Sequence, residues 1–334
     1  MGSVPTSAAG RWSEATVIEN YGEDGAGLGA IDGTQYAVPY RATVKSLVWY
    51  RPDVFADRDW TIPTTLDELT VLVERIAADG ELAPWCLGIN AGSATGWAAT
   101  DWTEDLVLRS IGPDRYQQWA TGEIEFADPA IADAFAQFRA LTLDPGRTLG
   151  GIRGIVETPV DQAILPLLDE TPGCAMHRQA DSAANWIPDG TTIGPDGDVD
   201  VFVLPGITDS APPLVVGGTQ AVQFQTDNDT NALLNYLASA EAATIWARQG
   251  GFISLNHLVP DDAYPDDHFR QLTAAIDQAP AIVFDASDQM PPAIGADLLW
   301  DEITAWVAGT DDYPTFASNI DNARAANEPP PSDS

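Results

Sequence analysis

Acidic side chains are the most numerous groups in this sequence that could do chemistry. Fifty of its 334 residues are Asp or Glu, and Glu104 and Asp105 lie beside Asp101 and Trp102 on a predicted helix. Two carboxyl groups that face each other across a sugar at roughly 5–10 Å hydrolyse a glycosidic bond when one of them has a raised pKa. With so many carboxylates accidental pairs are expected, and the sequence does not select one pair as catalytic.

Other catalytic, cofactor and metal signatures are absent from the sequence. The run 92–96 misses the spacing of a G-x-S-x-G nucleophile elbow, and no phosphate-binding G-x4-G-K-[ST] loop occurs. Asp196, Asp198 and Asp200 have the spacing that opens a calcium loop, but the glycine and the distal glutamate of that loop are missing. We therefore expect no metal, no cofactor and no enzyme activity.

The eleven tryptophans favour a binding function instead. Trp97 follows a glycine, Trp102 follows an aspartate, and Trp300 lies at the polar edge of an apolar helix pattern. Flat aromatic faces pack on the C–H faces of sugar rings, while Asp, Glu, Arg or Gln side chains bond to the hydroxyls. Core packing is the competing interpretation of each tryptophan, and in that interpretation Trp300 lines the core together with Trp306.

The charge of the chain excludes nucleic acid as an expected partner. Fifteen basic residues against 50 acidic ones give a formal net charge of −35, and Lys45 is the only lysine. Phosphate binding needs clustered cations, whereas the arginines here are scattered. The sequence contains no run of 18 apolar residues, so it predicts no membrane span. Residues 1–7 lack the pattern of a signal peptide.

Cys86 and Cys174 are the only cysteines, and two states are open for them. A disulfide would close a long loop and stabilise the fold by about 4 kcal/mol on the chain-entropy model. Two buried thiols are the alternative.

Strand and helix patterns alternate along the chain. A capping pattern at Thr65 and Glu68, an apolar stripe and a terminal Gly80 predict a helix between residues 65 and 80. Further helices are predicted at about 101–110, from 128 onward, and at 228–237, 240–249, 266–278, 292–308 and 312–326. Strands are predicted at about 36–40, 46–50, 85–89, 173–178, 199–204 and 215–224. Such alternation is typical of an α/β fold whose sheets are covered by helices.

Several segments carry a family resemblance in the same order along the chain. Residues 32–40 have the pattern D-G-x-x-Y-x-x-P-Y, and residues 46–50 read S-L-V-W-Y. The pattern continues through segments at 64–69, 84–89, 94–97, 100–102, 173–174, 217–218, 250–254 and 284–291. From about residue 29 to 326 the chain resembles the family 1 extracellular solute-binding proteins of ABC importers, in their sugar-binding, alpha-glucoside-like branch.

The resemblance implies an α/β fold of the periplasmic-binding-protein-like type II, with two lobes and a hinge. Family members carry a long segment before the D-G-x-x-Y pattern, so the first lobe is expected to be incomplete. The expected parts are a disordered or linker lead-in at 1–28, a partial first lobe at 29–45 and 215–265, a second lobe at 46–214 and 266–326, and a disordered tail at 327–334.

The implied function is the binding of a sugar or oligosaccharide, without chemistry, in a cleft between the lobes. Two groups of ligand-binding residues are expected: Trp97, Asp101, Trp102, Arg178, Gln179, Asp288 and Trp300 around the sugar, and Arg41, Lys45 and Thr219 on the hinge side. The implied partners are a carbohydrate ligand and ABC transporter permease subunits, and the implied location is extracellular, cell-surface or periplasmic. We expect a monomer.

Three alternatives stay open. Aromatic faces with carboxylates also bind cationic solutes such as polyamines or quaternary ammonium compounds, and a net charge of −35 favours such ligands. A carboxylate-pair glycosidase is a second alternative. A remnant that binds no ligand is the third, because of the short first lobe.

Overall fold

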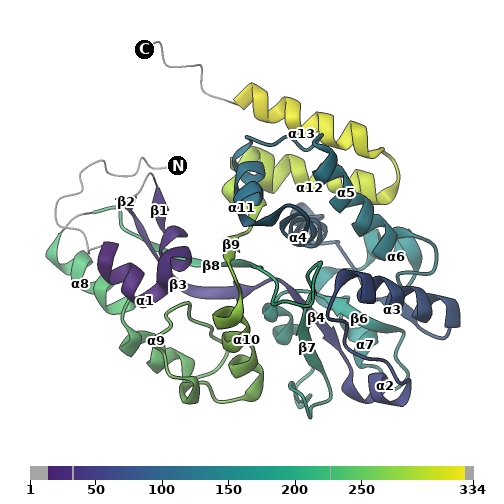
Figure 1. Ribbon diagram of the computed structural model, residues 1–334, viewed down its shortest axis with the longest axis horizontal. Helices are drawn as coiled ribbons and strands as arrows, with labels where there is room; N and C mark the ends of the chain where they lie inside the picture. Colours follow the sequence, from purple (N-terminus) through teal and green to yellow (C-terminus); the bar gives the residue numbers. More distant parts are fainter. Residues whose placement is uncertain (1–13, 32–33, 226, 328–334) are drawn as a thin grey trace. The chain divides into compact units, whose positions relative to one another are not determined.

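The computed structural model describes residues 14–31, 34–225 and 227–327, and the chain divides into two compact units (Figure 1). Unit 1 comprises the chain up to Val44 together with Val216–Val283, and unit 2 comprises Lys45–Val215 and Phe284–Ser334. The chain therefore passes between the units three times. The first two passages lie within a residue of the expected lobe boundaries. The third follows Val283 instead of residue 265, because the last strand of unit 1 pairs within the sheet of that unit.

Unit 1 contains a three-stranded sheet with helices around it. Its sheet has the order β3-β8-β9, and β3 and β8 are antiparallel. The elements of this unit are α1 (Glu14–Gly27), β1 (Ala30–Ile31), β2 (Thr34–Gln35), β3 (Ala37–Val44), β8 (Leu214–Val222), α8 (Asn228–Leu237), α9 (Ala240–Ala247), α10 (Asp267–Gln278) and β9 (Ile282–Phe284).

Helix α1 corrects the expectation of an unordered lead-in over residues 1–28. Val17 and Tyr21 of this helix are buried, and the Tyr21 hydroxyl donates a hydrogen bond to the carbonyl of Ala238 at 3.2 Å. These long-range contacts order a segment whose small and polar residues gave no helix signal. Residues 1–13, the rest of the expected lead-in, and residues 328–334 of the expected tail lie outside the described residues; Asn327 ends the last helix.

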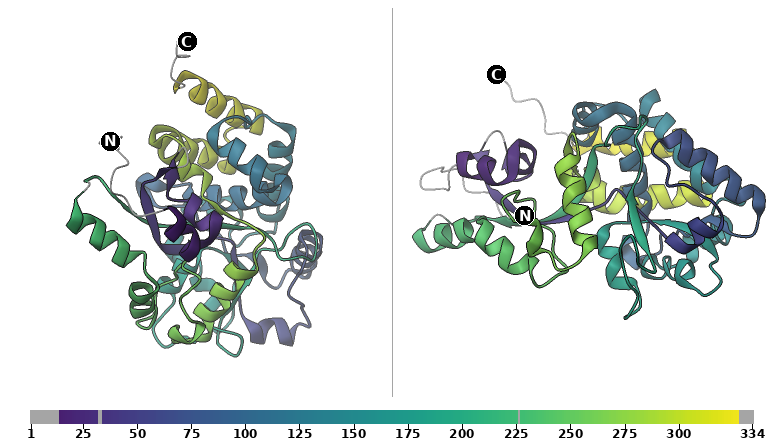
Figure 2. Two further views of the ribbon diagram at one scale, coloured as in Figure 1. Left: turned by 60° about the vertical axis from the view of Figure 1, so that its left-hand side comes forward. Right: turned by 60° about the horizontal axis from the view of Figure 1, so that its bottom comes forward.

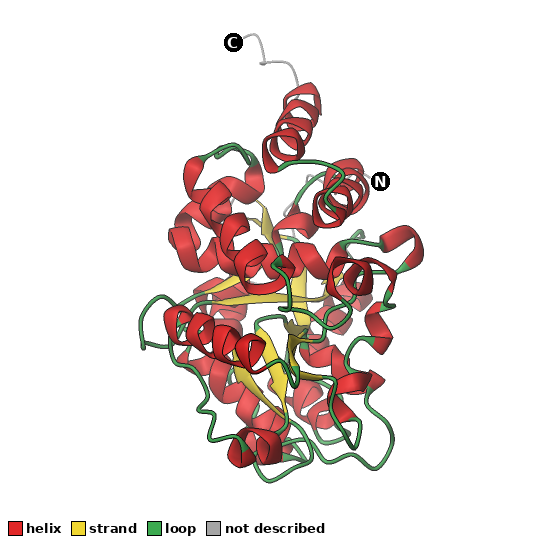
Figure 3. Ribbon diagram, turned by 90° about the vertical axis from the view of Figure 1, so that its right-hand side faces the viewer, coloured by secondary structure: helices red, strands yellow, loops and turns green. Residues whose placement is uncertain are grey.

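Unit 2 is built on a four-stranded sheet with the order β5-β6-β4-β7. Strands β5 and β6 are parallel, and β4 is antiparallel to both β6 and β7. Its strands are β4 (Leu47–Tyr50), β5 (Ala83–Trp85), β6 (Cys174–Arg178) and β7 (Asp200–Val203). Its helices are α2 (Pro52–Asp57), α3 (Leu66–Asp79), α4 (Trp97–Thr121), α5 (Pro129–Phe138), α6 (Gly151–Glu157), α7 (Leu165–Leu168), α11 (Ala286–Gln289), α12 (Leu299–Ala308) and α13 (Tyr313–Asn327). Helices α12 and α13 pack side by side (Figure 2), and in Figure 3 strands lie between helices.

Helix α3 confirms the prediction made from its end signals. The Thr65 side chain accepts a hydrogen bond from the Glu68 backbone N–H at 3.1 Å, which satisfies one of the free donors of the first turn. At the other end Gly80 takes a left-handed conformation with φ 69°, which glycine adopts without steric cost. The expected apolar stripe is buried.

Helix α4 is longer than the predicted segment 101–110. It begins at Trp97, and a glycine with non-helical angles, Gly112 (φ 76°), kinks it before Pro113. The aromatic residues Phe126, Phe135, Phe138, Trp306 and Phe316 form a connected cluster of ring contacts in this unit. This cluster belongs to the core against which α4 is buried over most of its first three turns.

Cys86 and Cys174 form a disulfide, with 88 residues of sequence separation and both residues buried. Of the two states left open by the sequence, the structure has the bridge. It joins the chain just after β5 to the first residue of β6, the strand that pairs in parallel with β5.

Candidate functional site

Polar side chains of unit 2 gather where β5 and β6 end and β4 begins. Because β4 is antiparallel to β6, its start lies at the same edge of the sheet as the end of β6, and the Gln179 N–H bonds to the carbonyl of Leu47 at 3.1 Å. The chain after β5 reaches that edge too, and leads to Gly96 and the first residue of α4, Trp97. The carboxyl ends of parallel strands are the usual ligand-binding edge of an open α/β sheet.

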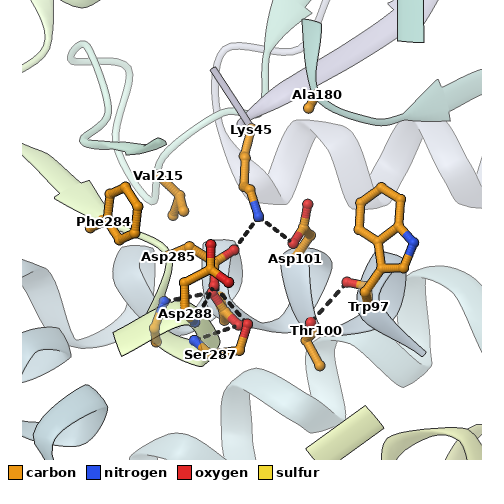
Figure 4. A network of polar contacts seen from close by, with 12 residues as sticks. Lys45, Trp97, Thr100, Asp101, Ala180, Val215, Phe284, Asp285, Ser287 and Asp288 are labelled. Atoms are coloured by element: carbon orange, nitrogen blue, oxygen red, sulfur yellow. Dashed lines mark hydrogen bonds and ion pairs between the residues drawn. The ribbon is translucent and has the colours of Figure 1, made fainter. Parts of the chain in front are cut away.

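Lys45 occupies the centre of this edge (Figure 4). Its ammonium bonds to the carboxylate of Asp101 on α4 at 2.9 Å, and it also pairs with the carboxylate of Asp285, which caps the short helix α11. In Figure 4 the Lys45 side chain points between the two aspartates, with Trp97 beyond Asp101 and Asp288 on the Asp285 side. The only lysine of the sequence is thus enclosed by two carboxylates.

A second group of charges lies one turn further along α4. Asp105 receives a hydrogen bond from Nη2 of Arg178 at 2.8 Å and pairs with Arg109 on its own helix. All three side chains are fully buried. The Ser46 hydroxyl donates to Asp105 at 2.6 Å, so the segment that precedes β4 is tied to the same carboxylate.

Glu104 completes the acidic face of α4. Its carboxylate accepts hydrogen bonds from the backbone N–H groups of Ala286 at 2.8 Å and Ser287 at 3.2 Å. The Tyr116 hydroxyl lies 3.4 Å from the same carboxylate. Glu104 therefore holds the first turn of α11 against α4.

Burial and the neighbouring charges raise the pKa values of some groups in this network and lower that of another. Burial raises the pKa of Asp101 to about 6, against the attraction of Lys45. Burial acts in the same direction on Asp285, but the charge of Lys45 and hydrogen bonds from Lys45 and Ser287 outweigh it and lower the pKa of Asp285 to about 2. Burial and the charge of Asp285 raise the pKa of Glu104 well above its ordinary value. Burial works against the ammonium of Lys45, yet the surrounding carboxylates raise its pKa above the ordinary value.

The structure separates the expected ligand residues by their exposure. Trp97 and Trp300 are half-buried, and the segments that carry them touch, because Gly96 lies against the backbone carbonyl of Trp300. Asp288 is exposed. These three side chains keep surface that a solute can contact.

Trp102 and Gln179 lie inside the unit, in contrast to the expectation. Trp102 is 1% exposed and makes edge-to-face contacts with Trp85 and Phe138, so its aromatic faces are used by the core. Gln179 is buried, and its side-chain oxygen accepts from the N–H of Ala180 at 2.8 Å. The aspartate that precedes Trp102 in the sequence did not signal exposure, because the helix turns Trp102 inward.

Asp101, Arg178 and Lys45 lie close together, and their charged groups mainly contact one another. Asp101 is 1% and Arg178 2% exposed, and their closest charged atoms are 3.9 Å apart. The remaining pair, Arg41 and Thr219, lies in unit 1 as cross-strand neighbours of β3 and β8.

Sequence reasoning missed Asp285 and the role of the α4 acids. The segment 284–291 was singled out, but Asp288 was chosen as its polar ligand residue and not the cap residue Asp285. The spacing of Asp101, Glu104 and Asp105 was the available signal, since residues three and four apart share one face of a helix. Their partners come from remote segments, which no local pattern indicates.

A model of the bacterial extracellular solute-binding protein family matches residues 12–244. The chain belongs to this family. This solute-binding protein is 37% identical over 296 residues to the osmoprotective compounds-binding protein GgtB of Synechocystis sp., a match that covers 88% of the chain and 69% of GgtB. It is 34% identical over 283 residues to the alpha-glucosides-binding periplasmic protein AglE of Rhizobium meliloti, with 83% of the chain and 61% of AglE covered. It thus spans about two thirds of the length of these relatives.

Solved structures show that the solute-binding protein has the expected type II fold. The solute receptor AcbH, whose structure is described with a preference for galactopyranose, matches with a TM-score of 0.73 and 18% identity over 93% of this chain and 76% of that one. A cyclic alpha-maltosyl-1,6-maltose binding protein from Arthrobacter globiformis matches with a TM-score of 0.66 and 19% identity, over 95% and 78% of the two chains. Within the described ranges of the solute-binding protein, helices long and apolar enough for a membrane span are not found.

Proposed function

We propose that this protein binds a sugar or oligosaccharide and presents it to an ABC importer. The observation that carries the proposal is its 34% identity, over 83% of the chain, to a protein named for binding alpha-glucosides. Several solved proteins with the same fold are described with galactopyranose, chitin oligosaccharide, raffinose or maltose as ligand, which supports the same solute class. The fold likeness by itself supports only the architecture.

The residues proposed to contact the sugar are those that keep accessible surface at the carboxyl edge of unit 2. Trp97 supplies a half-buried indole at the start of α4, and the backbone of Trp300 touches the residue before it. Asp288 supplies an exposed carboxylate on α11, the short helix that Asp285 caps. An aromatic face can pack on the sugar ring, and a carboxylate can accept hydrogen bonds from its hydroxyls.

The buried charges are proposed to support this edge and not to catalyse a reaction. Lys45 pairs with Asp101 and Asp285, and Arg109 and Arg178 pair with Asp105, so these groups already have ionic partners. We propose binding without chemistry, as a monomer, outside the cytoplasm, with the permease subunits of an ABC transporter as protein partners.

An osmoprotective compound is the second candidate for the solute. The 37% identical relative is named for binding such compounds, and a net charge of −35 favours a cationic member of that class, such as a quaternary ammonium compound. The two candidates differ in their response to salt. Binding of a cation weakens as ionic strength rises, whereas binding of a neutral sugar changes little.

Calorimetry with a panel of glucosides, maltose, raffinose and choline, a quaternary ammonium cation, tests the proposal at low and at high salt. Salt-independent binding of at least one sugar supports it, and salt-sensitive binding of choline alone supports the second candidate. If no member of the panel binds or raises the melting temperature, neither solute proposal stands, because a ligand that binds the native state must stabilise it.

Two tryptophan variants place the solute once a ligand is found. Trp97→Ala removes a half-buried indole and should weaken binding at least about tenfold, or by about 1.4 kcal/mol. Trp102→Phe is the matched control, since Trp102 is enclosed by Trp85 and Phe138. It should lower the melting temperature and leave affinity unchanged. The reverse pattern would exclude Trp97 from the site.

A further inference from the structure

The three passages of the chain between the units all begin or end beside helix α4. On the unit 2 side the residues at these passages are Lys45, Val215 and Phe284. The first two are bonded directly, because the Lys45 N–H donates to the carbonyl of Val215 at 2.9 Å. The third leads at once to Asp285, the partner of the Lys45 ammonium.

Each acidic residue of the α4 triplet, Asp101, Glu104 and Asp105, holds a different passage. Asp101 bonds to Lys45 at the first passage, at 2.9 Å. Glu104 accepts from the backbone N–H groups of Ala286 and Ser287 after the third passage, at 2.8 and 3.2 Å.

Asp105 acts on the second passage through one intermediate. It accepts a hydrogen bond from the Ser46 hydroxyl at 2.6 Å, and the Ser46 oxygen in turn accepts from the backbone N–H of Val215 at 3.0 Å. All three carboxylates of the triplet are buried, with residue exposures of 1% or less.

We propose that this acidic triplet fixes the three passages to α4, so that they form one rigid root in unit 2. On the unit 1 side of the passages, Gly217 and Gly218 of β8 pair with Thr43 and Ala42 of β3. Lys45, which the family resemblance suggested as a hinge-side ligand residue, is a positioning residue in this arrangement.

The free-energy cost of an unpaired buried carboxylate favours three passages that stay fixed to α4. A buried carboxylate without a counter-charge or hydrogen bonds costs several kcal/mol, so local opening that exposes only one passage leaves its acid unpaired in the interior. The passages should therefore open together with α4 and not separately. This inference does not depend on which solute the protein binds.

Amide hydrogen exchange on the wild-type protein tests the inference without any substitution. The N–H groups of Val215, Ala286 and Ser287 should exchange within about tenfold of the amides of Leu106, Val107 and Leu108 in α4, under conditions where exchange reports opening equilibria. Exchange of these passage amides more than about a hundredfold faster than α4 would overturn the inference. Intermediate ratios are decided by the variants below.

Two variants each release one passage and distinguish the triplet from general packing. Ser46→Ala removes the acceptor of the Val215 N–H and should speed exchange at Val215 about tenfold or more, with Ala286 unchanged. Glu104→Leu removes both acceptor oxygens and should speed exchange at Ser287, with Val215 unchanged. Glu157→Gln, in an exposed pair with Arg153, is the control and should change none of these rates. If Ser46→Ala and Glu104→Leu leave their own passages unchanged, the triplet is not the root.

The single lysine gives an independent measurement. Apart from the α-amino group, an amine-reactive reagent reports on Lys45 alone, and its side chain is only 14% exposed. Asp285→Asn should raise the rate of Lys45 modification at least about tenfold if the pair holds the first and third passages together. An unchanged rate would show that Lys45 is shielded by other contacts and would contradict its place in the root.

Discussion

Arg178, the last residue of β6, donates a hydrogen bond from Nη2 to Asp105 of α4 at 2.8 Å, and both side chains are fully buried. Asp105 also pairs with Arg109, so one carboxylate serves two guanidinium groups in the interior. The sheet edge and the helix are connected by charge as well as by apolar packing. Removal of Asp105 leaves two buried guanidinium groups without the carboxylate that they share.

Asp105→Asn should lower the free energy of unfolding by about 3–5 kcal/mol, because it leaves Arg109 and Arg178 buried without their carboxylate. Urea unfolding followed by circular dichroism measures the change. Glu157→Gln is the control, since its pair with Arg153 is exposed, and it should change stability by less than about 0.5 kcal/mol. Equal effects of the two substitutions would show that the buried pairs carry no special cost.

His177 should make the protein less stable as the pH falls from about 6.5 to about 4. Its Nδ1 lies 2.9 Å from the carbonyl of Cys86, and burial lowers its pKa to about 4. In that window the unfolded chain binds a proton at this residue and the folded chain does not, so acidification favours unfolding. The full difference amounts to about 3 kcal/mol at most.

The measurement for His177 is the free energy of unfolding against pH for the wild type and for His177→Gln. The wild-type slope between pH 6.5 and 4 should be steeper, since the variant has no group that titrates at this position. Asp101 acts in the opposite direction near the same pH, because its raised pKa makes protonation favour the folded state, and it is present in both proteins. Parallel curves would contradict a buried neutral His177.

The Cys86–Cys174 bridge should contribute about 2–5 kcal/mol to stability, since it closes a loop across 88 residues of sequence separation. The double variant Cys86→Ala/Cys174→Ala should unfold at a correspondingly lower urea concentration. Both cysteines are buried, so a mild reductant should leave the folded wild-type protein unchanged over hours. Rapid reduction of the native protein would show that the bridge is exposed by local opening.

Gly96→Ala should be more destabilising than Gly92→Ala, although both glycines have positive φ angles. At Gly96 (φ 110°) an added Cβ lies 2.4 Å from the carbonyl oxygen of Trp300, whereas at Gly92 (φ 63°) it meets nothing within 4 Å. Both variants have the cost of a left-handed residue, about 1 kcal/mol, and only Gly96→Ala must also move α12 away from the start of α4. Thermal unfolding of the two variants should differ by several degrees, and equal melting temperatures would contradict the close approach of Gly96 to Trp300.

Local signals predicted many elements, because they act within a few residues. Thr65, Glu68 and Gly80 defined α3, and the apolar runs at 173–178 and 199–204 correspond to β6 and β7. Helix α1 and the kink at Gly112 escaped prediction. The first depends on contacts such as that of Tyr21 with Ala238, 217 residues away, and the second lies inside a segment that was predicted to end before it.

The sequence by itself determined the family, the α/β architecture and the candidate set of tryptophans and acids, since these follow from residue order and local periodicity. Only the tertiary structure decided which of them share one edge and which are enclosed. Trp97 and Trp102 are five positions apart on the same helix, yet one is half-buried and the other is in the core. Lys45 meets Asp285 across 240 residues of sequence, and pairings over such distances depend on the packing of the whole unit and not on any local pattern.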